Sequence, residues 1–234
     1  MASLYLFPTL LAPTDWRESL PDSNVKRVIE GDCFIVEELR TARRFLRKIG
    51  FTKPFEQVTF FVLNEHTTDE EMADYLLPVK EGRDIFLMSE AGLPCVADPG
   101  NKIVSLAHRI NIEVIPLVGP SSIYMSLMAS GFNGQNFAFT GYLPVKDNDR
   151  EKKLRQIEER CYKENQTQIF IEAPYRNDRI FQSMLKILND NTLLCIATDI
   201  TSPNQSIRTL SIADWKKQKD FVIGKRNTIF LIYK

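Results

Sequence analysis

Short apolar segments alternate with longer amphipathic segments through the first half of the chain. The apolar segments have the length and composition of buried strands, and they lie at Leu4–Phe7, Cys33–Val36, Thr59–Leu63, Ile85–Met88 and Ile112–Val118. The segments between them repeat apolar residues at helical spacing, near residues 15–29, 40–49, 68–80 and 100–110. Alternating strands and helices are typical of βαβ units, so the sequence predicts an α/β fold with a mainly parallel sheet.

Three helix ends are marked by particular residues. Thr68 and Glu71 have the spacing of a capping box, which predicts that a helix begins there. Gly50 follows an apolar stripe and is predicted to be the left-handed residue after the last turn of that helix. Asp98 and Pro99 predict an N-cap and a first helical residue for the next helix.

Beyond residue 118 the strands are more closely spaced. We expect helices at 123–130, 147–163 and 177–189. We expect strands at Phe137–Thr140, 168–172, 193–198, 206–210 and Thr228–Tyr233. The change of pattern predicts an N-terminal α/β domain at 1–118 and a C-terminal α/β domain at 119–234, in which the sheet is mixed and carries flanking helices.

Composition limits the classes of protein to which the chain can belong. Its 30 Lys and Arg balance its 30 Asp and Glu, so any surface that binds nucleic acid has to be a local basic patch. No apolar run reaches the roughly 18 residues of a membrane span, and the N-terminus lacks the basic region of a signal peptide. The four cysteines and two histidines lack metal-ligand spacing, so we expect no metal, no membrane association and a reducing compartment.

The segment Ser89–Gly100 is the first candidate for a ligand site. It lies between a predicted strand and a predicted helix, and open α/β sheets bind ligands at the carboxyl ends of their strands. The segment is longer than a connection requires, and it holds two glycines, two prolines and the carboxylates of Glu90 and Asp98. The alternative is an ordinary β–α turn in which Asp98 caps the following helix.

Two later segments also end beside predicted helices. Val118–Ser122 precedes a helix whose N-terminal N–H groups would attract a carboxylate, unless Ser121 or Ser122 only caps that helix. Glu172 and Arg176 are expected at the end of a strand, where the alternative is a surface ion pair that contributes little.

One predicted helix is rich in basic residues, which are Arg40, Arg43, Arg44, Arg47 and Lys48. Such side chains can contact phosphate, and the alternative is a solvated helix face. The loop after the first strand, Pro8–Asp15, contains no glycine, and the chain has neither GxGxxG there nor GxxxxGK[ST] anywhere. This excludes the usual dinucleotide and triphosphate motifs but leaves a nucleoside cofactor without phosphates.

Taken in order, these segments resemble motifs of the tetrapyrrole methylase superfamily, the class III methyltransferases. They are most similar to its branch that methylates a ribose 2′-O in 16S ribosomal RNA. Ser89–Gly100 resembles the branch motif S-D-A-G-T-P-x-I-S-D-P-G, and Gly119–Ser121 resembles part of P-G-P-S-A. The other matching segments are Glu37–Arg40, Glu65–His66, Ala129–Gly131, Phe139–Pro144 and Glu172–Arg176.

The resemblance implies two α/β domains with S-adenosylmethionine in a cleft between them, in a protein that is usually a homodimer. It implies cofactor contacts at Ser89, Glu90, Ala91, Gly92, Ala97, Asp98, Ser121, Ser122, Phe139, Glu172, Ala197, Asn227 and Thr228. The chain departs from the family pattern where Pro8-Thr-Leu-Leu replaces T-P-I-G-N-L. It also carries Glu90 for an aspartate and lacks the Arg and Lys of A-R-E-L-T-K in Ala197–Ser202.

We therefore expect a cytoplasmic methyltransferase that uses S-adenosylmethionine to methylate ribosomal RNA, either free or in the small ribosomal subunit. Asp98 or Glu90 is the candidate base for a ribose hydroxyl. The candidate RNA contacts are Arg40, Arg43, Arg44 and Arg176. Two alternatives stay open: a class III methyltransferase acting on a small tetrapyrrole-like molecule, and a relative that binds the cofactor without catalysis.

Overall fold

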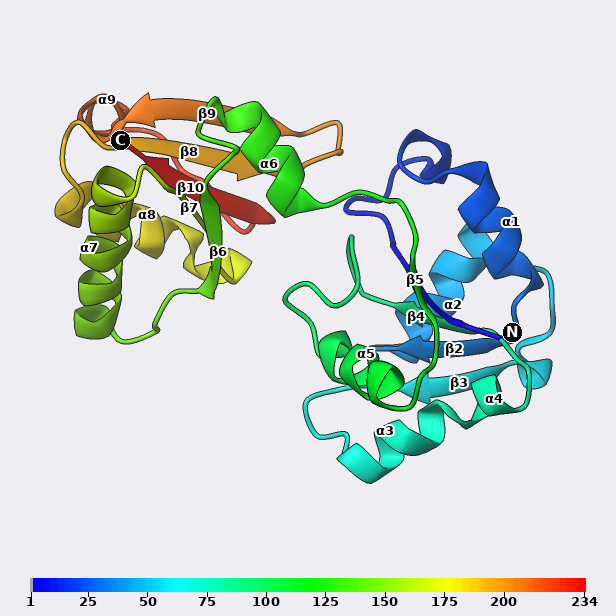
Figure 1. Cartoon of the computed structure of the whole chain (residues 1–234). Helices are drawn as coiled ribbons and strands as arrows, with labels where there is room; N and C mark the ends of the chain where they lie inside the picture. The colour runs from blue at the N-terminus through cyan, green and yellow to red at the C-terminus, as the bar shows by residue number, and fades with distance from the viewer. Residues whose placement is uncertain (1) are drawn as a thin grey trace. The chain divides into compact units, whose positions relative to one another are not determined.

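The computed structural model describes residues 2–234 and divides the chain into two compact units, Met1–Ser121 and Ser122–Lys234. Each unit is built on its own five-stranded sheet with helices packed against it (Figure 1).

The first unit contains a parallel sheet in the order β3-β2-β4-β1-β5. Its strands are β1 (Leu4–Phe7), β2 (Cys33–Val36), β3 (Thr59–Val62), β4 (Ile85–Met88) and β5 (Val114–Pro116). Its helices are η1 (Trp16–Glu18), α1 (Asp22–Glu30), α2 (Leu39–Lys48), η2 (Phe55–Gln57), α3 (Asp69–Tyr75), α4 (Leu77–Lys80) and α5 (Gly100–Arg109). The predicted parallel α/β sheet is confirmed.

Both faces of this sheet are buried, which explains why its strands are apolar without interruption. Successive side chains of a strand point to opposite faces, so Phe34 belongs to the apolar cluster that includes Leu46 of α2. Its neighbour Ile35 belongs to the cluster that includes Ile103 of α5. Helices on both faces are what a parallel sheet requires, because each crossover returns over one of them.

Two helices that the sequence predicted as continuous are interrupted. The segment 15–29 forms η1 and α1, and Pro21 is the N-cap of α1. The segment 68–80 forms α3 and α4, and the first of them ends at Tyr75, shortly before Pro78. Proline lacks the N–H that a continuing helix needs, so each proline stands at or near the start of a new helix.

The helix ends of α2 and α3 follow the prediction. The Thr68 side chain accepts a hydrogen bond from the Glu71 N–H, and the Glu71 side chain accepts one from the Thr68 N–H, which completes the capping box of α3. Gly50 has a φ of +98° just beyond α2, in the left-handed region that glycine enters without steric cost.

The second unit contains a mixed sheet in the order β6-β7-β10-β8-β9, in which only β6 and β7 are parallel. Its strands are β6 (Phe137–Tyr142), β7 (Thr167–Ile171), β8 (Leu193–Thr198), β9 (Ser206–Ser211) and β10 (Thr228–Tyr233). Its helices are α6 (Ser122–Ser130), α7 (Asp147–Lys163), η3 (Pro174–Arg176), α8 (Asn177–Ile187) and α9 (Ile212–Lys217). The mixed sheet is as the sequence predicted.

The short helix α9 was not predicted. Its Trp215 side chain is fully buried and packs against Phe181 and Phe221. The indole N–H donates to the Leu194 carbonyl at 2.9 Å, so the polar end of the ring is also satisfied. Six residues are too few to show a helical period in the sequence.

None of the helices among residues 2–234 combines the length and hydropathy that a membrane crossing needs. In the same residues, no three His, Cys, Asp or Glu side chains gather into a group that could hold a metal ion.

Candidate functional site

Three loops meet at the carboxyl edge of the first sheet, and backbone hydrogen bonds join two of them. The N–H of Thr9, after β1, donates to the Gly92 carbonyl at 3.0 Å. The Thr9 hydroxyl donates to the Ser89 carbonyl at 3.1 Å, and the Ser89 hydroxyl donates to Gly92 O at 3.0 Å. Thr9 and Ser89 are buried, so the start of the segment 89–100 is held in a fixed conformation from the loop after β1.

The third loop, residues 118–121, packs closely against the other two. A Cβ on Gly92 would lie 2.9 Å from Leu11 Cδ2 and 3.2 Å from the Pro120 carbonyl oxygen, and φ of Gly92 is +78°. A Cβ on Gly119 would lie 2.3 Å from Pro8 Cβ. Both glycines therefore permit approaches that no other residue would allow.

The Asp98 carboxylate stabilises the second half of the segment 89–100. Its oxygens accept hydrogen bonds from the Cys95 N–H at 2.8 Å and the Gly100 N–H at 2.8 Å. Cys95 and Ala97 have φ values of +68° and +65°, a region that residues with a Cβ seldom occupy. The bonds to Asp98 hold this strained backbone in place.

The prediction that Asp98 is the N-cap of α5 was wrong. The N-cap is Pro99 and the helix begins at Gly100, so Asp98 stands one residue earlier and bonds across the turn. Burial raises the pKa of Asp98, and the two backbone N–H donors oppose that rise. Both carboxylate oxygens are used within the loop.

Glu90 is bound to the start of α2 and the end of β2. Its backbone N–H donates to Glu37 Oε1 at 3.0 Å, and the Thr41 hydroxyl donates to Glu90 Oε1 at 2.6 Å. The carboxylate of Glu38 accepts from the Arg40 and Thr41 N–H groups and so caps α2. Glu90 itself is exposed, whereas Glu37 is half-buried.

The carboxylates of Glu37, Glu90 and Asp98 therefore lie close together at this edge of the sheet. The pKa of Glu37 is raised by burial, and the charges of Asp98 and Glu90 raise it further, while the N–H of Glu90 lowers it. Like charges near one another disfavour ionisation of each carboxyl group, so they act in the same direction as burial.

The other predicted residues of the first unit have varied surroundings. Ala91 and Ala97 are exposed in the loop, and Ser121 is buried at the end of the unit. Arg40 and Arg44 are exposed on α2, and Arg43 is half-buried there. Thr41 on the same helix bonds to Glu90, so α2 begins directly beside the candidate loop.

In the second unit, Glu172 and Arg176 form a buried ion pair instead of the surface pair considered from the sequence. Their side chains are 1% and 17% exposed. Glu172 Oε1 also accepts the Ala173 N–H at 2.8 Å. Glu172 Oε2 and Arg176 Nε are buried without a hydrogen-bond partner among the described residues. Glu172 thus retains one unsatisfied acceptor.

The same sheet edge contains the start of β10 and the end of β8. Thr228 pairs with Thr198 across these strands, and the Asn177 side-chain amide donates to Thr228 Oγ1 at 3.1 Å. Asn227 donates its N–H to Asp199 Oδ1 at 3.2 Å.

The remaining predicted residues of this unit are Ala197, fully buried in β8, Phe139, half-buried in β6, and Ser122, the first residue of α6. The structure therefore brings Glu172, Ala197, Asn227 and Thr228 to one edge of one sheet.

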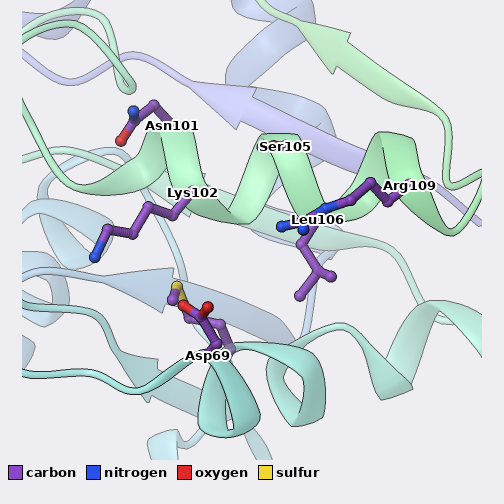
Figure 2. A pocket seen from close by; sticks show the side chains of 7 residues that line it. Asp69, Asn101, Lys102, Ser105, Leu106 and Arg109 are labelled. Carbon is purple, nitrogen blue, oxygen red and sulfur yellow. The ribbon is translucent and has the colours of Figure 1, made fainter.

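A groove of about 490 Å³ lies between α3 and α5, and none of the predicted site residues lines it (Figure 2). It is lined by Asp69, Met72, Asn101, Lys102, Ser105, Leu106 and Arg109. Lys102 and Arg109 extend along it from α5, and Asp69 faces them from the start of α3 (Figure 2). Its mixed charge does not select one class of ligand.

No protein-family model matches the chain. Among curated proteins, it is 31% identical over 181 residues to the ribosomal RNA small subunit methyltransferase I of Thermotoga maritima, covering 77% of each chain. The chain belongs to the ribosomal RNA small subunit methyltransferase I family. It is also 31% identical to the Haemophilus influenzae protein of that name and 29% identical to the Vibrio cholerae one, covering 75% and 78% of this chain.

The chain spans 59% of the Haemophilus relative and 60% of the Vibrio relative. Solved structures share its fold over nearly the whole length. The methyltransferase CobJ has a TM-score of 0.65 at 15% identity, covering 100% of this chain and 95% of that one. The cobalt precorrin-4 methyltransferase CbiF has 0.62 at 13%, covering 99% and 94%. The class III methyltransferase fold expected from the motifs is therefore confirmed.

Three residues that bond to the segment 89–92 were not among the site residues predicted from the sequence, although Glu37 begins the segment Glu37–Arg40 that resembles a family motif. They are Thr9, Glu37 and Thr41, which bond to the segment 89–92 from other elements. Glu37 directly follows β2, and Thr41 lies in the first turn of α2. Their position just beyond the carboxyl end of a strand was a signal that could have identified them. Thr9 lies where the chain departs from the family pattern, and nothing in that pattern indicates its role.

Proposed function

We propose that this protein is an S-adenosylmethionine-dependent methyltransferase that methylates the ribose 2′-O of a nucleotide in ribosomal RNA. The observation that carries the proposal is the 31% identity to the Thermotoga maritima methyltransferase I over 77% of both chains. That stretch is long enough to include the motifs of both units.

The residues present fit the cofactor. In the first unit, the proposed contacts are Ser89, Glu90, Ala91, Gly92, Ala97, Asp98 and Ser121. In the second unit, the unsatisfied Oε2 of Glu172 can accept a donor such as a hydroxyl or amino group. Phe139, Ala197, Ser122, Asn227 and Thr228 complete the proposed contacts.

S-adenosylmethionine supplies a methyl group activated on a sulfonium sulfur. The protein has to position the acceptor hydroxyl, exclude water and take up the hydroxyl proton. Glu90 is a better candidate base than Asp98, because it is exposed and Asp98 uses both oxygens within the loop. Glu37, whose pKa is raised, adjoins Glu90 and is the next candidate.

The basic helix α2 supports RNA as the acceptor. Its exposed residues Arg40 and Arg44 lie within one turn of Thr41, whose hydroxyl bonds to Glu90. Proteins contact nucleic acids largely through the phosphates, which arginine side chains can bind. Arg176 is a weaker candidate for RNA contact, because its charge is already balanced by Glu172 in a buried pair.

The test is incubation with radiolabelled S-adenosylmethionine and small ribosomal subunits that lack methylation. Label in the small-subunit RNA, located to a 2′-O by nuclease digestion, is the expected result. Cofactor binding by calorimetry without label in RNA would overturn the RNA assignment, and it would leave a small tetrapyrrole-like acceptor or a binding protein without catalysis.

We also propose that the protein is a cytoplasmic homodimer. Sedimentation would test the oligomeric state, and cell fractionation would test the location.

A further inference from the structure

The basic residues of α2 are unusual because the chain as a whole has no net charge. The helix contains no acidic residue, and its cations are Arg40, Arg43, Arg44, Arg47 and Lys48. Within residues 2–234, none of these five takes part in an ion pair. In contrast, α7 pairs Arg150, Arg160 and Lys163 with carboxylates.

Two of these arginines are fixed on aromatic rings. The guanidinium of Arg43 lies 5.2 Å from the ring centres of both Phe55 and Phe60. That of Arg47 lies 4.0 Å from the Phe55 ring and donates to the Phe51 carbonyl at 2.6 Å. The three rings also contact one another, with Phe55 stacked on Phe51 at 5.8 Å. The rings therefore restrict where both guanidinium groups can point.

Arg43 lacks both a hydrogen-bond partner for its Nε and a counter-ion among the described residues. Its Nε is buried and has no hydrogen-bond partner among the described residues, and no carboxylate neutralises its charge. A partly buried cation without a counter-ion is costly unless an anion reaches it. A planar guanidinium whose orientation is fixed is well suited to bind phosphate through its forked donors.

We propose that α2 and the rings beneath it form a surface that binds the phosphate backbone of single-stranded RNA. We call it the arginine–phenylalanine surface, and it consists of Arg40, Arg43, Arg44, Arg47, Lys48 and Phe55. Arg43 and Arg47 contact phosphates from fixed positions, and Phe55 is a positioning residue that does not touch the RNA. This proposal rests on the proposed function and specifies how its substrate is held.

The surface is continuous with the candidate site. The Thr41 hydroxyl, one residue from Arg40, bonds to Glu90 Oε1 at 2.6 Å. RNA that follows α2 toward its N-terminus therefore arrives at the loop that holds the candidate base.

The test is binding of a fluorescein-labelled single-stranded oligoribonucleotide from small-subunit ribosomal RNA, followed by anisotropy at several salt concentrations. Arg43→Lys keeps the positive charge but loses the planar guanidinium that lies against the rings, and we expect about tenfold weaker binding. Arg44→Ala is expected to reduce the slope of log affinity against log salt by about 0.7. Phe55→Leu removes the aromatic ring that contacts Arg43 and Arg47 without changing the charge, and we expect about threefold weaker binding.

The matched control is Arg155→Ala on α7, an exposed arginine outside the surface and without an ion pair among the described residues. Equal losses for Arg155→Ala and Arg44→Ala would overturn the proposal, as would unchanged binding by Arg43→Lys. If the wild-type protein methylates RNA while the α2 variants bind and react normally, the proposal for this surface is overturned and the proposed function stands. If the surface binds RNA but no methyl group is transferred, the proposed function fails and the surface stands.

Discussion

The Glu37 carboxylate accepts a hydrogen bond from the backbone N–H of Glu90, with 3.0 Å between Oε1 and N. The two residues follow adjacent parallel strands, because Val36 of β2 pairs with Met88 of β4. The bond therefore connects the end of β2 to the loop proposed to bind the cofactor. It makes Glu37 a positioning residue for that loop.

Replacing Glu37 is expected to weaken cofactor binding. Glu37→Ala leaves the Glu90 N–H without its partner, and a hydrogen bond to a charged group contributes about 1.5–3 kcal/mol, so we expect roughly a tenfold higher Kd for S-adenosylmethionine by calorimetry. Glu37→Gln retains an acceptor oxygen and should lose less than threefold of the affinity. Equal losses in the two variants would mean that the charge of Glu37, and not its hydrogen bond, matters.

Stability should depend on pH through Glu37. Burial raises its folded pKa above the ordinary value of 4.5, so the folded protein holds this proton more tightly than the unfolded chain does. Its contribution to stability is complete below pH 4.5 and is lost as pH rises through the folded pKa. We expect the free energy of unfolding of the wild type minus that of Glu37→Gln to fall over this range and then become constant.

Urea unfolding between pH 4 and 8 measures this difference. The fluorescence of Trp16 reports on the first unit, provided that Trp215 of the second unit is replaced by Phe in both proteins. A difference that rises with pH would contradict the expected sign.

The contact between Gly119 and Pro8 predicts a severe effect from one methyl group. Gly119→Ala would place Cβ 2.3 Å from Pro8 Cβ, and overpacking of this kind costs about 1–3 kcal/mol. Pro8→Gly in the same chain should recover part of the loss, because it removes both the Cβ and the Cγ that the new methyl group would meet. Thermal unfolding measures both effects, and Gly134→Ala, with nothing within 4 Å of its Cβ, is the control.

The buried pair of Glu172 and Arg176 should be more sensitive to losing one partner than both. Arg176→Met leaves a buried carboxylate without its cation and is expected to destabilise the second unit by about 3–5 kcal/mol. Glu172→Gln with Arg176→Met removes both charges and should be less destabilising. A double variant that is as unstable as the single one would show that the pair contributes through packing alone.

The sequence predicted nearly every strand because most of them are continuous apolar runs. Cys33–Val36, Ile85–Met88 and Thr228–Tyr233 begin and end where the pattern placed them. Helix ends were less certain, since Pro21 and Pro78 divide segments whose apolar spacing is otherwise continuous. Local periodicity does not show where a helix stops if its neighbour continues the same stripe.

The sequence by itself determined the α/β class, the mixed second sheet and the family, because buried strands need apolar runs and the motifs occur in the family's order. Only the tertiary structure decided which residues act together. Thr9, Glu37 and Glu90 are up to 81 positions apart in the chain and meet because parallel strands end at one edge. Likewise, the five basic residues of α2 can be recognised in the sequence, but only packing against Phe55 and Phe60 fixes the position of Arg43, which has no counter-ion.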